Sequence, residues 1–315
     1  ARFGEDALRM LRAARLAAQL GFAVEPRTRA AMSAHAPLIE RVSAERVRDE
    51  LLRTLLAPDH KAGFDLLLAT GLLGRVAPEV AAMAGVEQGG QHAYDVYTHS
   101  LLTVVDKDHA GLALAELLHD VGKPDTRTVA DGEVRFHRHE VVGAEKAAAL
   151  LRRLRLDGDT VELVTLLVRH HLVYGLRRAA DGAYRRLIRR VGRENVPLLA
   201  RLVRADLAAH GRLTPERLAE VEAILARLEE LAARPEPLTV KELAVGGRDV
   251  MEALGIGPGP LVGQVLARLL EAVLDDPSLN TRERLLPLVV ACAREIAQGG
   301  EEAPRPSGSA RPGSN

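Results

Sequence analysis

Apolar residues recur at helical spacing along most of the chain. In residues 5–20, Leu8, Leu11, Leu16 and Leu20 follow one another at intervals typical of a helix. Polar and charged residues occupy most of the positions between them. The segment is therefore predicted to form an amphipathic helix that packs through its leucines.

Most of the remaining chain has the same kind of pattern. Predicted helices cover residues 26–42, 45–56, 61–70, 72–84, 95–105, 112–118, 140–155, 159–171, 195–210, 214–233 and 261–274. Strands are expected only in a short hairpin around Asp131 and Gly132, a dipeptide that favours a turn. We therefore predict an all-α fold.

Composition supports this prediction and limits the possible functions. Apolar residues make up 47% and aromatic residues 3% of the 315 residues, a length that allows two or three domains. The abundant Leu and Ala favour helices over sheets. The 43 basic and 43 acidic residues balance, so no overall charge draws the chain to nucleic acid or to a membrane. Any contact with RNA must come from local basic patches.

The single cysteine and the lack of a long apolar run bear on location. Cys292 has no partner for an internal disulfide, which fits a reducing compartment, and we interpret it as a small core residue of a helix. No apolar run reaches the length of a membrane span, and no signal peptide is visible. We expect a cytoplasmic protein with no membrane partner, and the sequence leaves the oligomeric state open.

The strongest candidate for chemistry is the pair His119 and Asp120, at the end of the apolar helical run 112–118. An imidazole nitrogen beside a carboxylate oxygen suits Mn, Fe, Co, Ni or Zn. Gly122 is expected to break the helix and Lys123 to be free to meet an anion. A lone His-Asp pair is more often a polar pair at a helix end, so its neighbours decide the interpretation.

Three further histidines and an aspartate lie on or beside separate predicted helices. The ordered set resembles the HD phosphohydrolase superfamily in its two-metal form, and it consists of His99, His119, Asp120, His139, His171 and Asp206. The resemblance implies an all-helical bundle whose interior ligands hold two divalent ions, with Mn, Ni, Co, Fe or Mg as candidates. His171 matches the family position better than the adjacent His170.

The same resemblance implies hydrolysis of phosphoesters, including phosphomonoesters and 2′,3′-cyclic phosphates of nucleotides or RNA ends. Asp120 would bridge the two metals, which would activate the attacking water, and Lys123 would offset charge on the phosphoryl oxygens. Asp120 and Lys123 are therefore the expected catalytic residues.

A second resemblance covers nearly the whole chain. Residues 2–9 and 43–52 resemble the neck of bacterial CCA-adding tRNA nucleotidyltransferases, which belong with the poly(A) polymerases, and residues 255–286 resemble their body and tail. In that family an Asp and an Arg of the neck pair with the base edges of incoming CTP or ATP, and Asp6 and Arg9 match them. The resemblance implies tRNA or other RNA ends and nucleotide phosphates as partners.

The catalytic head of this family is not recognisable in the sequence. Such a head needs a Gly-Ser turn followed by an Asp-x-Asp pair, and the pair Asp106 and Asp108 lacks the turn. The chain also starts at Ala1 in mid-pattern, without Met. We expect that an N-terminal portion is missing and that this chain alone does not add nucleotides.

Basic residues cluster between positions 177 and 193, where seven arginines accompany one acid, Asp181. The cluster is either a solvated helix face or an RNA-backbone site. The candidate RNA-binding residues are Arg185, Arg186, Arg189 and Arg190. The glycine run 255–263 follows no predicted strand and contains two prolines, so we reject a dinucleotide site there.

The predicted organisation has four parts. Residues 1–90 form a helical neck and connector, 91–234 an HD phosphohydrolase domain, 235–298 a helical tail, and 299–315 a disordered end. A metal-dependent phosphohydrolase is the first functional hypothesis. The alternative is the tRNA-binding neck, body and tail of a CCA-adding enzyme. A scaffold with a degenerate site is disfavoured, because every expected ligand is present.

Overall fold

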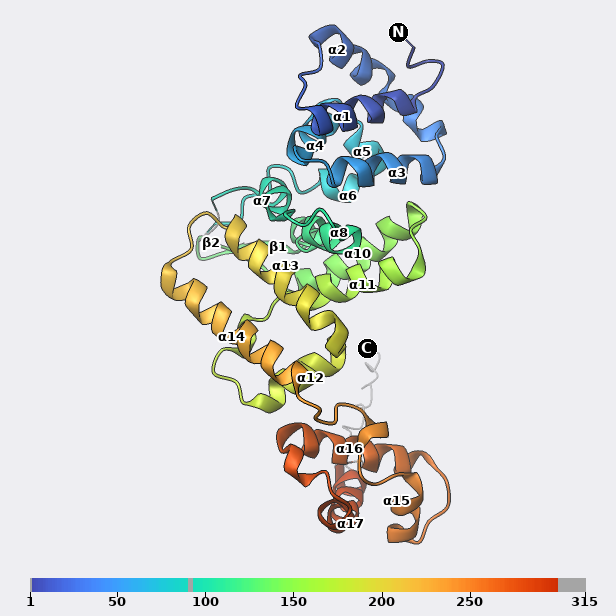
Figure 1. Cartoon of the computed structure of the whole chain (residues 1–315), viewed down its shortest axis with the longest axis vertical. Helices are drawn as coiled ribbons and strands as arrows, with labels where there is room; N and C mark the ends of the chain where they lie inside the picture. Colours follow the sequence, from blue (N-terminus) through green and yellow to red (C-terminus); the bar gives the residue numbers. More distant parts are fainter. Residues whose placement is uncertain (1, 90–92, 300–315) are drawn as a thin grey trace, which may run out of the picture. The chain divides into compact units, whose positions relative to one another are not determined.

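The computed structural model describes residues 2–89 and 93–299, and these are predominantly helical (Figure 1). This confirms the all-α prediction. The chain divides into two compact units, residues 1–177 with 191–229 and residues 178–190 with 230–315. The predicted boundary at residue 90 lies inside the first unit and stays a prediction. Residues 300–315 of the predicted disordered end lie outside the described residues.

The first unit begins with short helices that form a cluster of their own (Figure 1). They are α1 (Leu8–Leu20), α2 (Pro26–His35), the 3-10 helix η1 (Ala36–Arg41), α3 (Ala44–Leu55), α4 (His60–Ala69), α5 (Leu73–Val76) and α6 (Pro78–Ala81). Helix α1 packs on both α3 and α4. The single helix predicted over 72–84 is two short helices, since Ala77 leaves helical geometry before Pro78.

The buried face of α1 differs in part from the prediction. Leu8 and Leu11 are buried, but Leu16 is 44% and Leu20 55% exposed, and Ala14 and Ala18 occupy the buried positions instead. The physical reason is angular, because a step of five residues from Leu11 to Leu16 turns a helix by about 140°. Small residues therefore face the partners of α1 in its second half and allow close packing.

The rest of the first unit is built around helix α8. Its further elements are α7 (Val96–Thr103), α8 (Ala110–Leu118), α9 (Lys123–Thr126), β1 (Arg127–Ala130), β2 (Glu133–Phe136), α10 (His139–Arg153), α11 (Gly158–His170), η2 (Tyr174–Leu176), η3 (Arg193–Asn195), α13 (Val196–Ala209) and the first part of α14 (Pro215–Ala233). Strands β1 and β2 form the predicted antiparallel hairpin. Helix α8 is buried from Gly111 onward and packs on α7, α11 and α13.

A close approach of two backbones fixes the start of α10 beside the end of α8. A Cβ atom on Gly122 would lie 2.2 Å from the carbonyl oxygen of His139 and 2.6 Å from the amide nitrogen of Gly143. Only glycine allows this contact. The expectation that Gly122 breaks the helix is wrong in its reason, since α8 already ends at Leu118 and Gly122 has ordinary helical angles.

The second unit contains a smaller group of helices. They are α12 (Asp181–Val191), η4 (Val240–Glu242), α15 (Gly247–Leu254), α16 (Pro260–Asp275), η5 (Pro277–Leu279) and α17 (Arg282–Gly299), and α16 packs on α15 and α17. Gly255 ends α15 in the left-handed conformation and Gly259 precedes α16, so the glycine run is a turn between helices. Cys292 is buried in α17, as expected for a core residue.

None of the helices in the described ranges is long and apolar enough to cross a membrane.

Candidate metal centre

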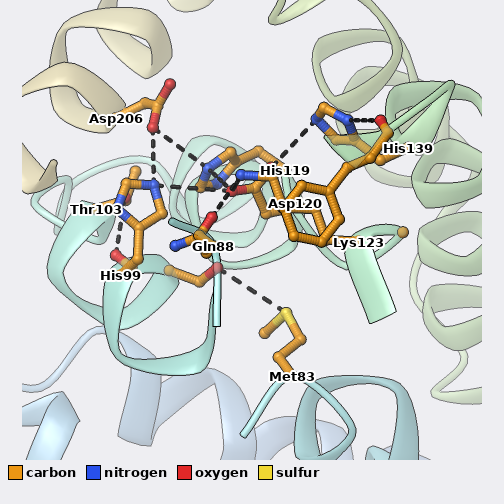
Figure 2. A network of polar contacts seen from close by, with 12 residues as sticks. Met83, Gln88, His99, Thr103, His119, Asp120, Lys123, His139 and Asp206 are labelled. Atoms are coloured by element: carbon orange, nitrogen blue, oxygen red, sulfur yellow. Dashed lines mark hydrogen bonds and ion pairs between the residues drawn. The ribbon is translucent and has the colours of Figure 1, made fainter. Parts of the chain in front are cut away.

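Six side chains on or next to five helices meet in the interior of the first unit. Figure 2 labels His99, His119, Asp120, His139 and Asp206 among them. His99 lies on α7, His119 and Asp120 follow α8, His139 begins α10, His171 follows α11, and Asp206 lies on α13. All of them except Asp206 are buried, and the Asp206 side chain is 18% exposed. The structure thus brings together the complete ligand set predicted from the sequence.

The first group of polar atoms lies between α7, α8 and α13. Nε2 of His99 is 2.8 Å from Oδ1 of Asp206 and 3.8 Å from Oδ2 of Asp120. Nε2 of His119 is 3.1 Å from the same Asp120 oxygen and 3.5 Å from Oδ1 of Asp206. Two imidazoles and two carboxylates therefore converge within the range of one ion's ligand shell.

The second group faces the other oxygen of Asp120. Oδ1 of Asp120 is 3.3 Å from Nε2 of His139 and 3.9 Å from Nε2 of His171. The two imidazole nitrogens are 3.4 Å apart. Asp120 consequently stands between the groups with one oxygen toward each, as a ligand shared by two ions would.

Backbone carbonyls fix the orientation of three of the imidazoles. Nδ1 lies 2.9 Å from the Glu116 oxygen in His119, 2.9 Å from the Phe136 oxygen in His139, and 2.7 Å from the Val168 oxygen in His171. Because a carbonyl only accepts hydrogen bonds, each Nδ1 carries the proton when the ring is neutral. The Nε2 lone pairs then point at Asp120, which is the usual arrangement of metal-binding histidines.

The site fits a bound cation because acceptors face one another in it. Among the described residues, no hydrogen bond of normal geometry reaches either carboxylate oxygen of Asp120 or Nε2 of His119. Buried polar atoms in this condition destabilise a fold unless a ligand satisfies them. Two groups of potential ligands share Asp120, one with His99 and His119 and one with His139 and His171. Imidazole and carboxylate together suit transition metals.

Electrostatics point the same way. Burial opposes the ionised form of Asp120, but His119 and Lys123 outweigh it and hold the pKa of this carboxyl well below its usual range. Burial likewise lowers the pKa of His119, yet Asp120 and Asp206 together raise it to about 10. A positive charge, either a proton on His119 or a metal ion, therefore stabilises the carboxylates of the first group. Burial and the nearby His119 lower the pKa of His171 to about 3, which keeps this ring neutral and able to bind a metal.

Lys123 is fixed at the edge of the centre. Its ammonium nitrogen lies 2.6 Å from Oδ2 of Asp120 and donates a hydrogen bond of 2.6 Å to Oε1 of Gln88. It also lies 5.4 Å from the centre of the Phe136 ring. The expectation of an unengaged lysine is therefore wrong, because Lys123 is anchored within the structure. Its catalytic role stays a prediction.

Two residues of the site were not predicted from the sequence. Gln88 lies in the segment before α7 and accepts the hydrogen bond from Lys123. In the sequence, the only indication of this role is that Gln88 lies 11 residues before His99. His210, one turn after Asp206, lies beside the His99 ring and forms a further group of potential ligands with His99 and Asp206. The spacing of four residues on a helix could have revealed it. His170 is outside these groups, which supports the choice of His171.

A cavity of about 590 Å³ opens at the centre. The cavity is lined by ligands of both groups together with cationic, amide and aromatic side chains, among them Asp120, His139, His171, Asp206, Lys123, Gln88, Arg135, Phe136, His210 and Arg217. Its size is in the range of small-ligand sites, and its positive side chains suit an anionic ligand.

The candidate base-reading residues are held in contacts within the chain. Asp6 accepts hydrogen bonds from the Leu8 amide at 3.1 Å and from the Arg46 guanidinium at 3.2 Å. Arg9 donates to the Arg2 carbonyl and to Glu5. Asp6 and Arg9 both lie at the start of α1, and their role in reading bases stays a prediction.

The candidate RNA-binding arginines differ from one another. Arg185 is only 4% exposed and donates to Glu236 at 2.5 Å and to the Leu274 carbonyl at 3.1 Å. Arg186 and Arg189 donate to Glu271 on α16. These three side chains are therefore paired with acids from distant sequence, which the local cluster of arginines did not indicate. Arg190 is exposed, and RNA binding stays a prediction.

Comparisons with known proteins extend this picture. The centre and its helices define the first unit as a helical protein with a candidate two-metal site. Residues 21–83 match the family model "Probable RNA and SrmB- binding site of polymerase A", and residues 141–289 match "tRNA nucleotidyltransferase domain 2 putative". Over these residues the chain is similar to those two families.

Curated relatives agree with these matches. The chain is 40% identical over 286 residues to an A-adding tRNA nucleotidyltransferase of Deinococcus radiodurans, with 85% of this chain and 64% of that protein covered. It is 39% identical over 282 residues to a CC-adding tRNA nucleotidyltransferase of Thermus thermophilus, with 85% and 62% covered. The comparisons support the resemblance to the CCA-adding family. The chain spans less than two thirds of the length of either relative.

A solved structure has the same fold. The crystal structure of the Bacillus stearothermophilus CCA-adding enzyme in complex with CTP superposes with a TM-score of 0.67 at 23% identity, covering 95% of this chain and 64% of that one. This similarity shows the fold of the chain.

Proposed function

We propose that the first unit carries a divalent-metal phosphohydrolase centre. One observation supports this above all: the two oxygens of Asp120 face two separate groups of imidazole Nε2 atoms. His99, His119 and Asp206 would hold one ion, His139 and His171 the other, and Asp120 both. Divalent ions held there would supply the Lewis acidity that hydrolysis of a phosphoester needs.

The protein's own groups would contribute position and charge. The backbone carbonyl of Phe136 fixes the orientation of the His139 ring, and that of Val168 fixes the His171 ring. Lys123, anchored by Gln88 and Asp120, places an ammonium group where a phosphoryl oxygen would develop charge. Because Lys123 and Asp120 are buried, water screens the attraction between their charges only weakly. Phosphomonoesters and 2′,3′-cyclic phosphates of nucleotides or RNA ends are the proposed substrates.

The two adjacent histidines allow a matched test of this function. We expect His171→Ala to weaken metal binding by about 10- to 100-fold or more and to lower hydrolysis of 4-nitrophenyl phosphate accordingly, because it removes a ligand. His170→Ala should change both much less, since His170 lies outside the ligand groups. Calorimetric titration with Mn²⁺ beside the hydrolysis assay measures both effects. The reverse order of severity would show that the wrong histidine was assigned.

A second function is favoured by the comparisons. We propose that the chain also serves as the tRNA-binding part of a tRNA nucleotidyltransferase, because its matches cover residues 21–83 and 141–289 in proteins of that kind. Nucleotide addition itself would depend on a catalytic head, with Asp6 and Arg9 reading the incoming base. The A-adding and CC-adding relatives are about equally similar, so similarity favours neither specificity.

Exposed Arg190 offers a test of tRNA binding. We expect Arg190→Glu to weaken binding of tRNA and to reduce the slope of log affinity against log salt by about one, since one phosphate contact is lost. Filter binding at several salt concentrations measures this. Arg186→Gln serves as the control, because Arg186 is already engaged by Glu271 and Asp275. An unchanged slope in Arg190→Glu would remove this residue from the interface.

A further inference from the structure

The guanidinium group of Arg217 faces the cavity from the first turns of α14. Its central carbon lies 3.0 Å from the centre of the Tyr174 ring, so the two planar groups stack. The Arg217 side chain is 30% exposed. The stacking partner belongs to η2, which follows the metal ligand His171 by only three residues. Arg217 is therefore tied to the metal-binding segment.

Tyr174 is itself held in place. Its hydroxyl donates to Oε2 of Glu220 at 3.0 Å and accepts from Arg177 at 3.0 Å. Arg177 also forms an ion pair of 2.8 Å with Oε1 of Glu220. Both oxygens of Glu220 are thus engaged, and the ring presents a fixed surface to the guanidinium group. Such a fixed group loses little conformational entropy when a ligand binds.

Within the part of the chain that the structure describes, the side-chain donors of Arg217 have no acceptor at hydrogen-bonding distance. Its nearest carboxylate oxygen, on Glu220, is 4.0 Å away, beyond hydrogen-bonding distance. None of the residues in the described ranges accepts a hydrogen bond from this guanidinium group. Because a guanidinium group carries five N–H donors in a planar fork, it suits an oxyanion such as phosphate.

The other cations of the cavity are already engaged. Lys123 lies between Asp120 and Gln88, and Arg135 forms an ion pair of 2.9 Å with Glu133. The reacting phosphoryl group would meet the metal ligands and Lys123. Arg217 is then left for an anionic group of the substrate that does not react.

We propose that Arg217 is a specificity-determining residue that binds a second phosphate of the substrate. The centre accordingly prefers a terminal phosphoester on an oligonucleotide strand, whose next backbone phosphate reaches Arg217, over a substrate with the reacting phosphate alone. This inference rests on the proposed phosphohydrolase function. It assigns binding, and no bond-breaking step, to Arg217.

Three substrates with the same reacting group isolate this effect. They are adenosine 3′-phosphate, the 3′-phosphorylated dinucleotide ApAp, and ApAp with an uncharged methylphosphonate in place of its internal phosphodiester. We expect the Mn²⁺-loaded protein to show a KM for ApAp about tenfold lower than for its uncharged analogue, the effect of one charge-assisted hydrogen-bonding contact. The kcat values should agree within about threefold.

Variants then assign the effect to Arg217. Arg217→Gln should raise the KM for ApAp to that of the uncharged analogue and leave adenosine 3′-phosphate unchanged. Arg217→Lys should retain part of the preference, because it keeps the charge. Arg177→Gln is the matched control: it also contacts Tyr174 and Glu220 but is not among the described residues that line the cavity, so the preference should persist. Melting temperatures verify that each variant is folded.

Binding of ApAp and its uncharged analogue, measured by calorimetry, separates this inference from the proposed function. Preferential binding of ApAp that requires Arg217, without hydrolysis, would contradict the phosphohydrolase function and support the role of Arg217. Equal binding and equal KM for the two dinucleotides would overturn the inference even if hydrolysis is rapid. A preference that survives in Arg217→Gln would overturn it as well.

Discussion

Replacement of Asp120 with alanine is expected to abolish metal binding at both positions and to lower hydrolysis of phosphomonoesters by about 10³-fold or more. Asp120 is the only described carboxylate that belongs both to the group with His99 and His119 and to the group with His139 and His171. Its loss therefore removes the proposed shared ligand of the two groups. Metal analysis and hydrolysis of 4-nitrophenyl phosphate measure the two effects.

Asp125→Ala is the matched control for this change. Asp125 lies five residues further on, in α9, and its exposed carboxylate pairs with Lys146 at the surface. Removal of an exposed ion pair has little effect on stability, and metal content and activity should stay near wild type. Asp120→Ala protein that keeps both ions at full occupancy would refute the assigned centre.

Gly122→Ala is expected to have the second-largest effect. The added methyl group would overlap the His139 carbonyl oxygen and the Gly143 amide nitrogen, neither of which can rotate away. Helix α10 must move outward, and we expect destabilisation of about 3 kcal/mol, which is roughly 6–12 °C in Tm for a unit of this size. Since His139 begins α10, metal affinity should fall in parallel.

Thermal unfolding and Mn²⁺ titration test this expectation. Gly158→Ala is the control, because a Cβ atom on Gly158, at the start of α11, would meet nothing within 4 Å. That substitution should be neutral or slightly stabilising. If Gly122→Ala kept wild-type Tm and metal affinity, the close contact of Gly122 with the start of α10 would not position His139 as described.

The candidate ligands that meet in the first unit could be picked out from the sequence because their signal is local. His119 and Asp120 end an apolar helix, and His171 ends another, so their place at a buried helix end follows from hydrophobic spacing. The order and residue types of the whole set then resembled those of the HD phosphohydrolase superfamily. The predicted helices correspond to the observed ones to within a few residues for α10, α11 and α13.

Features that depend on tertiary contacts could not be predicted. Gln88 and Arg217 belong to segments with no sequence signal for the site, and only the packing of the first unit brings their side chains to the cavity. The same limit explains the arginines of α12. Glu271, which pairs with Arg186 and Arg189, lies more than 80 positions away, so a local count of charges could not reveal these ion pairs.

The number and position of metal ions in the wild-type chain test most directly whether Asp120 joins two metal positions. After reconstitution with Mn²⁺, mass spectrometric metal analysis should find two ions per chain. Anomalous diffraction should place one beside His119 and Asp206 and the other beside His139 and His171, with Asp120 between them. A reconstituted chain that holds no metal, or holds it away from Asp120, would contradict the account.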